Sequence, residues 1–155
     1  MRWLCVALLV FSCLPIFAQT PCPMCQKPIV PSRAVYAVFA VGGPTYRLTF
    51  RCIQCALHAA GRWHPERALL RVRCAATGRW VTFRFNGHHW SAHPAFARLL
   101  LAPEKGGECL DRHLVFSHLK VARRFLRSHR SLASTPLLSI RQAAESQPRK
   151  VGDEP

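Results

Sequence analysis

Two pairs of cysteines, each with a two-residue gap, constrain the fold of this chain more than any other feature. Cys22 and Cys25 stand in the stretch PCPMCQKPI, and Cys52 and Cys55 stand in FRCIQCALH. A two-residue gap lets two thiolates converge on one ion, and four converging thiolates suit tetrahedral Zn(II) or a soft ion such as Cu(I). The sequence therefore predicts a four-cysteine metal site, which requires the intervening chain to bring the second pair back to the first.

The residues between the two pairs have the pattern of a β-hairpin. Residues 34–41 form a β-branched and aromatic run, 42–44 read Gly-Gly-Pro, and 45–51 alternate polar and apolar side chains. Helix-forming residues then start at Cys52 and continue to Gly61. The second pair therefore falls in the first turn of a short helix, where the partial positive charge of the helix N-terminus favours thiolate over thiol.

The remainder of the chain predicts further antiparallel structure. A second hairpin is expected over 67–85, a strand over 96–101, another over 109–116, and a closing helix from Ser117 to about residue 130. The expected class is α+β: a small antiparallel-sheet domain with a treble-clef-like CxxC…CxxC metal site and a closing C-terminal helix.

The two ends of the chain do not have the composition of a folded domain. Residues 1–18 carry one early charge and then an uncharged apolar run, which is typical of a secretory signal peptide cut after Ala18. An uncleaved anchor and lipidation at Cys13 are the alternatives. Residues 131–155, rich in Ser, Pro, Gln and charge, are expected to be a disordered tail. The domain is then 19–130, in a protein exported to the periplasm or the extracellular space.

Two other interpretations of the paired cysteines remain open. In an oxidising compartment, all four could form a disulfide framework. Alternatively, Cys52 and Cys55 could be a thioredoxin-like redox pair, although that motif normally lies in a βαβ unit rather than after a hairpin. Cys74 and Cys109 lie at the ends of predicted strands, where they could form a disulfide or remain buried free thiols.

Two further features could add ligands. Met24 is the one methionine left after signal-peptide removal. Its thioether could be an auxiliary ligand for Cu(I), or the side chain could simply fill space in the short loop between Cys22 and Cys25. The stretch HHWSAHP gathers three histidines that could form a second metal contact or lie on the surface. The other five, at positions 58, 64, 113, 118 and 129, are isolated in sequence and predict nothing.

The net charge of +15 could indicate nucleic acid, anionic lipid or an acidic partner. The basic residues are mostly Arg, they are dispersed, and no block of five occurs. We therefore expect mostly an ordinary solvated basic surface and, with an export signal, no nucleic-acid binding. An anionic membrane surface, bound through the basic face, is the alternative. The chain also lacks a phosphate-cradling glycine loop, GxSxG and HExxH, so we expect no enzyme activity.

Three stretches resemble the accessory proteins of nitrous-oxide reductase, the NosL family. CPMCQKPI is similar to the Cys-x-x-Cys-x-Met opening of that family, and AVYAVFAVGGPTYRLTFRCIQC resembles its strand–turn–strand before a metal-site segment. TGRWVTFRFNGHHWSAHPAFARLLLA followed by LVFSHLKVARRFLRSH resembles its strand with a Trp, its small-residue strand and the Phe before its closing helix. The resemblance covers residues 21–130 and implies an exported copper-binding protein. Here the methionine lies inside the cysteine pair and the second segment contains its own CxxC, which shifts the expected site toward four sulfurs.

The sequence thus leads to one expected function and two rivals. We expect a metal chaperone or accessory factor that binds Cu(I) or Zn(II) through Cys22, Cys25, Cys52 and Cys55 and passes the ion to an acceptor protein by ligand exchange. One rival is a structural zinc module whose basic surface binds an acidic partner. The other is a thiol–disulfide oxidoreductase that uses Cys52 and Cys55. The sequence predicts no oligomeric state.

Overall fold

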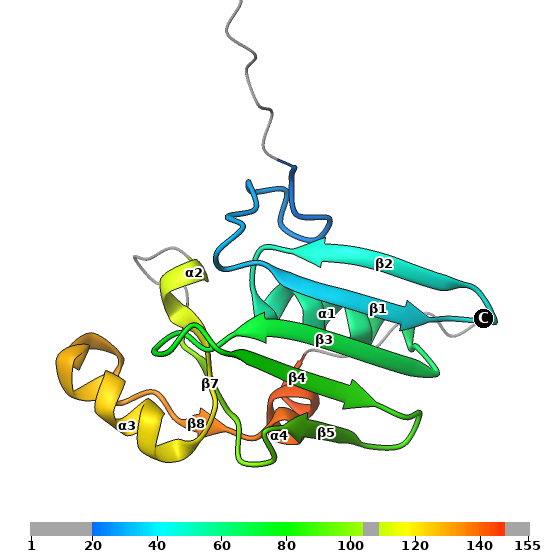
Figure 1. Cartoon of the computed structure of the whole chain (residues 1–155). Helices are drawn as coiled ribbons and strands as arrows, with labels where there is room; N and C mark the ends of the chain where they lie inside the picture. Colours follow the sequence, from blue (N-terminus) through cyan, green and yellow to red (C-terminus); the bar gives the residue numbers. More distant parts are fainter. Residues whose placement is uncertain (1–19, 104–108, 148–155) are drawn as a thin grey trace, which may run out of the picture.

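The computed structural model describes residues 20–103 and 109–147. These residues form two antiparallel sheets and four α-helices, so the predicted α+β class is confirmed (Figure 1). The five-stranded sheet has the order β2 (Thr45–Phe50), β1 (Val35–Ala40), β3 (Arg67–Arg73), β4 (Trp80–Phe85), β5 (Trp90–His93). The three-stranded sheet has the order β7 (His113–Phe116), β6 (Arg98–Leu101), β8 (Leu137–Leu138). The helices are α1 (Ile53–Trp63), α2 (Cys109–Arg112), α3 (Leu119–Ser128) and α4 (Ile140–Glu145), with a 3-10 turn at Arg130–Leu132.

The predicted first hairpin is present and returns the chain toward the N-terminal cysteines. Strands β1 and β2 pair from Ala40 with Thr45 to Val35 with Phe50. The connecting turn uses Gly42 and Gly43 at φ of 58° and 99°, where residues with a Cβ are disfavoured. Because the hairpin reverses direction, the end of β2 and the start of α1 lie beside the segment that precedes β1 (Figure 1).

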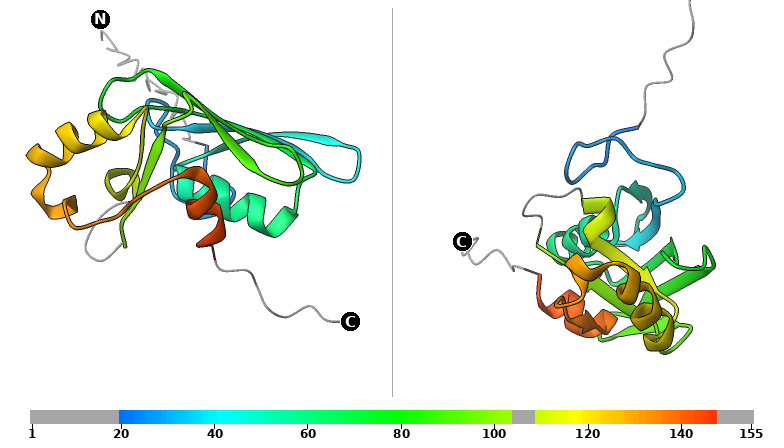
Figure 2. Two further views of the ribbon diagram at one scale, coloured as in Figure 1. Left: turned by 90° about the horizontal axis from the view of Figure 1, so that it is seen from below. Right: turned by 90° about the vertical axis from the view of Figure 1, so that its left-hand side faces the viewer.

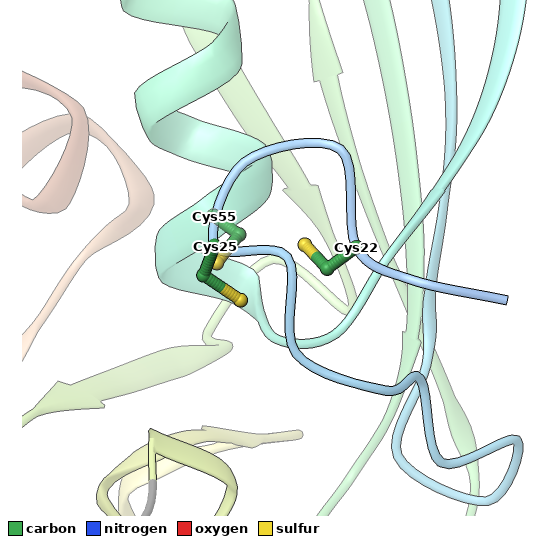
Figure 3. Close-up of side chains that lie close together, drawn as sticks. All are labelled: Cys22, Cys25 and Cys55. Atoms are coloured by element: carbon green, nitrogen blue, oxygen red, sulfur yellow. The ribbon is translucent and has the colours of Figure 1, made fainter. Parts of the chain in front are cut away.

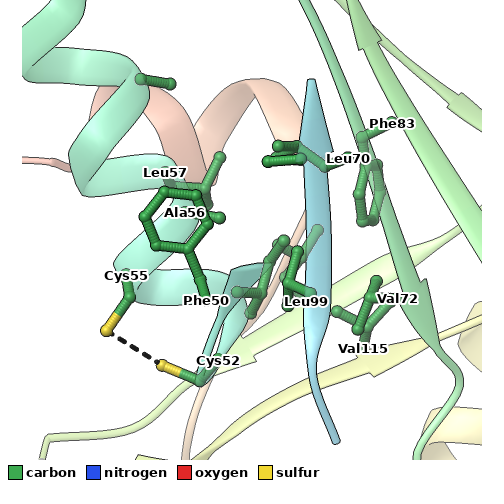
Figure 4. Close-up of a cluster of buried hydrophobic side chains, with 14 of the residues drawn as sticks. Phe50, Cys52, Cys55, Ala56, Leu57, Leu70, Val72, Phe83, Leu99 and Val115 are labelled. Carbon is green, nitrogen blue, oxygen red and sulfur yellow. Dashed lines mark hydrogen bonds between the residues drawn. The ribbon is translucent and has the colours of Figure 1, made fainter. Parts of the chain in front are cut away.

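One face of the five-stranded sheet is covered by helices. Helices α1 and α4 both lie beneath that face, with α1 against β1, β2 and β3 (Figure 2). Phe39, Phe50 and Phe83 are essentially fully buried in the layer between sheet and helices. Burial of each such side chain stabilises the fold by roughly 1.5–3 kcal/mol. Figure 4 shows that Cys52 and Cys55 lie at the edge of this packed core, which holds their backbone in place.

The opposite face of the same sheet is basic, and no helix or strand of the described residues covers it (Figure 2). Alternation along the strands places five exposed arginines on it: Arg47, Arg67, Arg71, Arg73 and Arg84. The guanidinium groups of Arg71 and Arg73 lie 4.9 and 4.4 Å from the ring centroid of Trp80. Strands β1 to β5 contain no Asp or Glu, and within the described ranges none of the five forms an ion pair. We refer to these five side chains as the arginine face.

The second sheet carries α3 on its side. Phe125 of α3 packs against Phe116 of β7, with ring centroids 5.2 Å apart, and Ala122 is fully buried. Helix α3 begins after His118, one residue later than expected. The segment 109–116, expected to be one strand, is α2 followed by β7, so that the chain turns sharply between Cys109 and His113.

The C-terminal segment differs from the sequence prediction. Within 131–155, the structure contains β8 and α4 in place of a disordered tail. The apolar side chains of Ile140 and Ala143 are buried against the main core, and a capping box between Ser139 and Gln142 starts the helix. A short apolar cluster was therefore enough to order this segment, because the sheet and α1 offered a surface on which it could pack.

The expected signal peptide, the Cys13 lipidation alternative and the end of the expected tail lie outside the described residues. None of the described helices has the length and apolar character needed to cross a bilayer.

Candidate metal centre

The Cys22–Cys25 knuckle is a tight, hydrogen-bonded loop. Cys22 N–H donates to the Lys27 carbonyl at 2.9 Å, and Gln26 N–H donates to the Cys22 carbonyl at 2.9 Å. A bridge between Pro21 and Pro28 closes the base of the loop. This geometry directs the two sulfur atoms of the knuckle toward the first turn of α1, where Cys55 lies (Figure 3).

The second pair stands at the start of α1, as predicted. Cys52 is the N-cap residue, with extended φ and ψ of −149° and 168°, and Cys55 is in the first turn. The Cys52 carbonyl accepts the N–H of Ala56 at 3.3 Å, the first hydrogen bond of the helix, and its side chain makes no capping hydrogen bond.

The first group of potential ligands joins the knuckle to the helix. The sulfur atoms of Cys22, Cys25 and Cys55 all lie within 4.8 Å of one another. Cys22 and Cys55 are buried, whereas Cys25 is partly exposed. We call these three residues the knuckle cluster; it contains three of the four cysteines that the sequence proposed as ligands.

The fourth cysteine, Cys52, belongs to a different group. Its sulfur lies with Cys109 and His113, and the ligand atoms of the three residues are within 4.8 Å of one another. The Cys52 sulfur is 3.4 Å from Nδ1 of His113. Cys52 and Cys109 are 2% and 3% exposed. We call these three residues the buried cluster; they come from the N-cap of α1, from α2 and from the start of β7.

The two clusters are in contact. A hydrogen bond of 3.6 Å joins the sulfur atoms of Cys52 and Cys55 (Figure 4). Five cysteines and one histidine therefore form a continuous ligand array with a shared border at the first turn of α1. All six cysteines in the described ranges are free thiols.

Arg51 links the base of the knuckle loop to the buried cluster. Its guanidinium donates to the Pro28 carbonyl, and its Nε donates to the Cys109 sulfur at 3.3 Å. The side chain is 7% exposed, so its charge acts in a poorly solvated environment. Arg51 thus supplies positive charge next to cysteines that must be thiolates to bind an ion.

Cys52, the N-cap residue of α1, and Cys55, in its first turn, have pKa values shifted in opposite directions. The hydrogen bond from the Cys55 thiol, which outweighs burial, lowers the pKa of Cys52 to about 4, with further help from His113. The same hydrogen bond, together with burial and the Cys52 charge, raises the pKa of Cys55 far above its ordinary value. In the metal-free protein, Cys52 is therefore the thiolate and Cys55 holds the proton.

The remaining cluster cysteines follow their surroundings. Burial and the charge of Cys52 raise the pKa of Cys109 to about 11, against the lowering effect of Arg51. Burial raises the pKa of Cys25. The pKa of Cys22 is lowered, because the backbone N–H groups of Arg51, Cys25 and Met24 together outweigh burial. Each cluster therefore combines a cysteine of lowered pKa with cysteines that must release a proton to bind an ion.

The other residues considered from the sequence lie elsewhere. Met24 is partly buried in the knuckle and packs against the core. Cys74 is a buried free thiol outside both clusters, so neither Cys74 nor Cys109 is in a disulfide. His88 and His89 line a separate cavity of about 540 Å³ at the far end of α1.

Two residues of the array, Cys109 and His113, and the neighbouring Arg51 were missed by the sequence analysis. Cys109 was considered only as a disulfide partner or buried thiol, His113 was treated as isolated, and Arg51 was counted with the dispersed surface charge. The four-residue separation of Cys109 and His113 was the available signal, since both a helix and a strand can place such a pair on one face. Arg51 had no sequence signal beyond its position next to Cys52.

Comparisons with known proteins give a fold but no family. No protein-family model matches the chain, and no curated protein matches its sequence. The fold is similar to that in the crystal structure of the mercury-bound form of MerB2, with a TM-score of 0.56 and 19% sequence identity. The match covers 77% of this chain and 61% of the MerB2 chain, so this chain spans less than two thirds of that protein.

Two expectations change with this comparison. MerB2 is an organomercurial lyase, and its fold contradicts the expectation that this chain is not an enzyme. The likeness is to a protein that binds a metal, as expected, but it gives no support to the NosL family. Each of the two clusters could hold a metal ion, and the fold is similar to that of a mercury-bound protein.

Proposed function

We propose that this protein captures a thiophilic metal ion with Cys52, Cys109 and His113. The observation that carries the proposal is the convergence of two thiols and one imidazole, from three separate elements, within 4.8 Å. The pKa of about 4 makes Cys52 a thiolate at neutral pH, which is the form that binds metals. A cavity of about 20 Å³, lined in part by Cys52 and His113, lies beside these ligands and exceeds the roughly 10–15 Å³ needed for a water-sized guest.

The ion is proposed from ligand chemistry. Cu(I) and Zn(II) follow from the cysteine-rich array, and the fold likeness to a mercury-bound protein adds Hg(II). Two sulfurs and one nitrogen satisfy Cu(I) or Hg(II) at low coordination number, whereas Zn(II) would need a fourth ligand. Soft ions therefore fit the buried cluster best, and Met24 would add a thioether donor near the knuckle for Cu(I).

Competition titrations of the reduced full-length chain test the proposal. Each of the three ions is titrated against a chelator under anaerobic conditions. Cys109→Ser should lower the affinity of the preferred ion at least about tenfold, a loss of roughly 1.4 kcal/mol. Cys74→Ser is the matched control, because Cys74 is also a buried free thiol but belongs to neither cluster.

The same titrations separate the proposal from its rivals. Native affinity in Cys109→Ser would reject the buried cluster as the binding site. A Cys52–Cys55 disulfide in the protein as isolated, with no bound ion, would favour the oxidoreductase. An ion that can be removed only by unfolding would favour the structural zinc module. Loss of Cu(I) affinity in Met24→Ala, with Zn(II) affinity unchanged, would support a thioether ligand.

We further propose that the captured ion is handed to an acceptor protein after export of the chain. The support is chemical: thiolate ligands exchange readily, and one member of the array, Cys25, is partly exposed. Equilibrium dialysis of the ion-loaded protein against a thiol-rich acceptor peptide, with Cys25→Ser as the variant, measures this transfer directly.

We also propose that the arginine face docks on an anionic membrane surface. The face is exposed, contains five guanidinium groups and lies on strands without acidic residues. Charge complementarity therefore favours a negatively charged partner. The aromatic ring of Trp80, which is contacted by the guanidinium groups of Arg71 and Arg73, is of the type enriched where a protein meets the headgroup region.

A second candidate function is cleavage of a carbon–mercury bond, favoured by the fold likeness to MerB2. The Cys52 thiolate would bind mercury in R–Hg–X and displace X as an anion. The Cys109 thiol, protonated because its pKa is about 11, would give its proton to the carbon. The electron pair of the C–Hg bond forms the new C–H bond, RH leaves, and Hg(II) remains bound to both sulfurs.

Incubation with phenylmercury acetate and measurement of benzene release tests this activity. The native chain and Cys74→Ser should release benzene, whereas Cys52→Ser and Cys109→Ser should not. Binding of Hg(II) without benzene release in the native chain would leave capture as the function and reject the lyase.

A further inference from the structure

The ligand array has an outer part and an inner part. The knuckle cluster includes Cys25, which is partly exposed, whereas Cys52 and Cys109 of the buried cluster are 2% and 3% exposed. An ion that arrives from solvent can reach Cys25 without movement of the core. The two clusters meet at one contact, the 3.6 Å separation between the sulfur atoms of Cys55 and Cys52.

We propose that the knuckle cluster is a loading site, which takes the ion from solvent and passes it to the buried cluster through Cys55 and Cys52. This inference rests on the proposed function, since it assumes that the ion comes to rest in the buried cluster. It gives the CxxC knuckle a role that the buried cluster alone does not require.

The contact distance fits a shared ion. Two sulfurs bonded to one tetrahedral ion at roughly 2.3 Å lie roughly 3.8 Å apart. The Cys52 and Cys55 sulfurs, at 3.6 Å, can therefore bind the same ion with little movement of either side chain. Because both residues lie in the first turn of α1 and at its N-cap, the helix holds this separation fixed.

The transfer is an exchange of ligands without redox change. The ion begins on Cys22, Cys25 and Cys55, is bridged by Cys55 and Cys52, and ends on Cys52, Cys109 and His113. Each cysteine that leaves the ion takes up a proton from water, and Cys109 releases its proton to water as it binds. The oxidation state of the ion and of every sulfur stays the same.

Arg51 is a positioning residue in this scheme. Its guanidinium contacts the Pro28 carbonyl at the base of the knuckle and the Cys109 sulfur of the buried cluster. It therefore fixes the knuckle relative to the inner ligands. Its charge also lies next to the thiolates that are formed and released as the ion moves.

Stopped-flow loading of the reduced full-length chain with Hg(II) from its glutathione complex tests the inference. Mercury–thiolate charge-transfer absorbance reports each step. The native chain should show a fast capture phase and a slower transfer phase. Cys22→Ser/Cys25→Ser should lose the fast phase and load the buried cluster about tenfold more slowly, an effect that a barrier higher by about 1.4 kcal/mol produces. Its final affinity should stay within about twofold of native.

Cys55→Ser separates capture from transfer. It also controls for the possibility that the double variant loses the fast phase because its knuckle is misfolded. It keeps Cys22 and Cys25, which suffice for two-coordinate Hg(II), but removes the bridging sulfur. Fast capture should persist and the transfer phase should slow. Cys74→Ser, the matched control, should behave as native in both phases.

The remaining outcomes are decisive. Native loading rates in Cys22→Ser/Cys25→Ser, or an unchanged transfer phase in Cys55→Ser, would overturn the loading site and leave the buried cluster as an independent site. Full native affinity and a single fast phase in Cys109→Ser/His113→Ala would instead show that the ion rests on the knuckle, which rejects the proposed function itself.

Discussion

The sulfur atoms of Cys52 and Cys55 lie 3.6 Å apart, and their shared hydrogen bond drives their pKa values in opposite directions. The pair therefore holds one proton over a wide pH range. This asymmetry distinguishes two neighbouring cysteines that the sequence presents as equivalent members of one motif.

The Cys52 thiolate should persist in acid. In metal-free protein, thiolate absorbance should show a step near pH 4, where the Cys52 thiolate takes up its proton. Since folding lowers this pKa from 9.0, the stabilisation it gives is full above pH 9, declines as pH falls, and is lost below about pH 4. The ultraviolet difference between native and Cys52→Ser protein isolates the step, and its absence near pH 4 would contradict the assigned proton arrangement.

Arg51 should stabilise the fold as well as the array. Arg51→Ala removes hydrogen bonds from a buried cation to the Pro28 carbonyl and the Cys109 sulfur, and should lower the free energy of unfolding by about 2–3 kcal/mol. Urea unfolding measures the change. Arg47→Ala, at an exposed arginine of β2 on the arginine face, should change it by less than about 0.5 kcal/mol. Equal effects in the two variants would reject a special role for Arg51.

Helix α4 should contribute to global stability. Ile140 is 5% exposed, so Ile140→Ala should lower the free energy of unfolding by about 2–4 kcal/mol through lost burial and a residual cavity. The exposed neighbour Arg141→Ala should have an effect within about 0.5 kcal/mol. Thermal or urea unfolding distinguishes the two, and a silent Ile140→Ala would mean that α4 is not packed on the core in solution.

The arginine face should dominate membrane binding. Replacement of Arg71, Arg73 and Arg84 by Glu should weaken cosedimentation with phosphatidylglycerol vesicles by at least about 3 kcal/mol, roughly a hundredfold, because each basic side chain near the surface contributes about 1 kcal/mol. The matched control reverses three arginines of α3: Arg123, Arg124 and Arg127. Equal losses would indicate bulk charge, and tighter binding of the native chain to single-stranded DNA than to vesicles would point to nucleic acid instead.

Much of the architecture was predictable because its signals are local. The hairpin of β1 and β2, the helix that follows it and the position of the second CxxC at its start were all predicted from alternation, turn glycines and helix-forming residues. The short apolar cluster near Ile140 gave too weak a local signal, since its order depends on a surface made by the sheet and α1.

The division of the ligands between the knuckle cluster and the buried cluster could not be predicted from the spacing of the cysteines in the sequence. A CxxC pair predicts that two sulfurs can meet, but not that the N-cap position turns Cys52 away from the knuckle and toward His113. The position of Cys109 depends on the short helix α2, whereas the sequence predicted a strand over 109–116. These features arise from tertiary contacts between residues more than fifty positions apart.

The wide sequence separation of the ligands has a consequence for when an ion can be held. The array draws on the N-terminal knuckle, the start of α1 and the α2–β7 junction, so an unfolded or partly folded chain contains the thiols but does not bring them together. Ion binding is therefore thermodynamically linked to completion of the fold, and each tenfold excess of free ion over the Kd adds about 1.4 kcal/mol to stability. A bound ion would therefore stabilise only the fully folded chain.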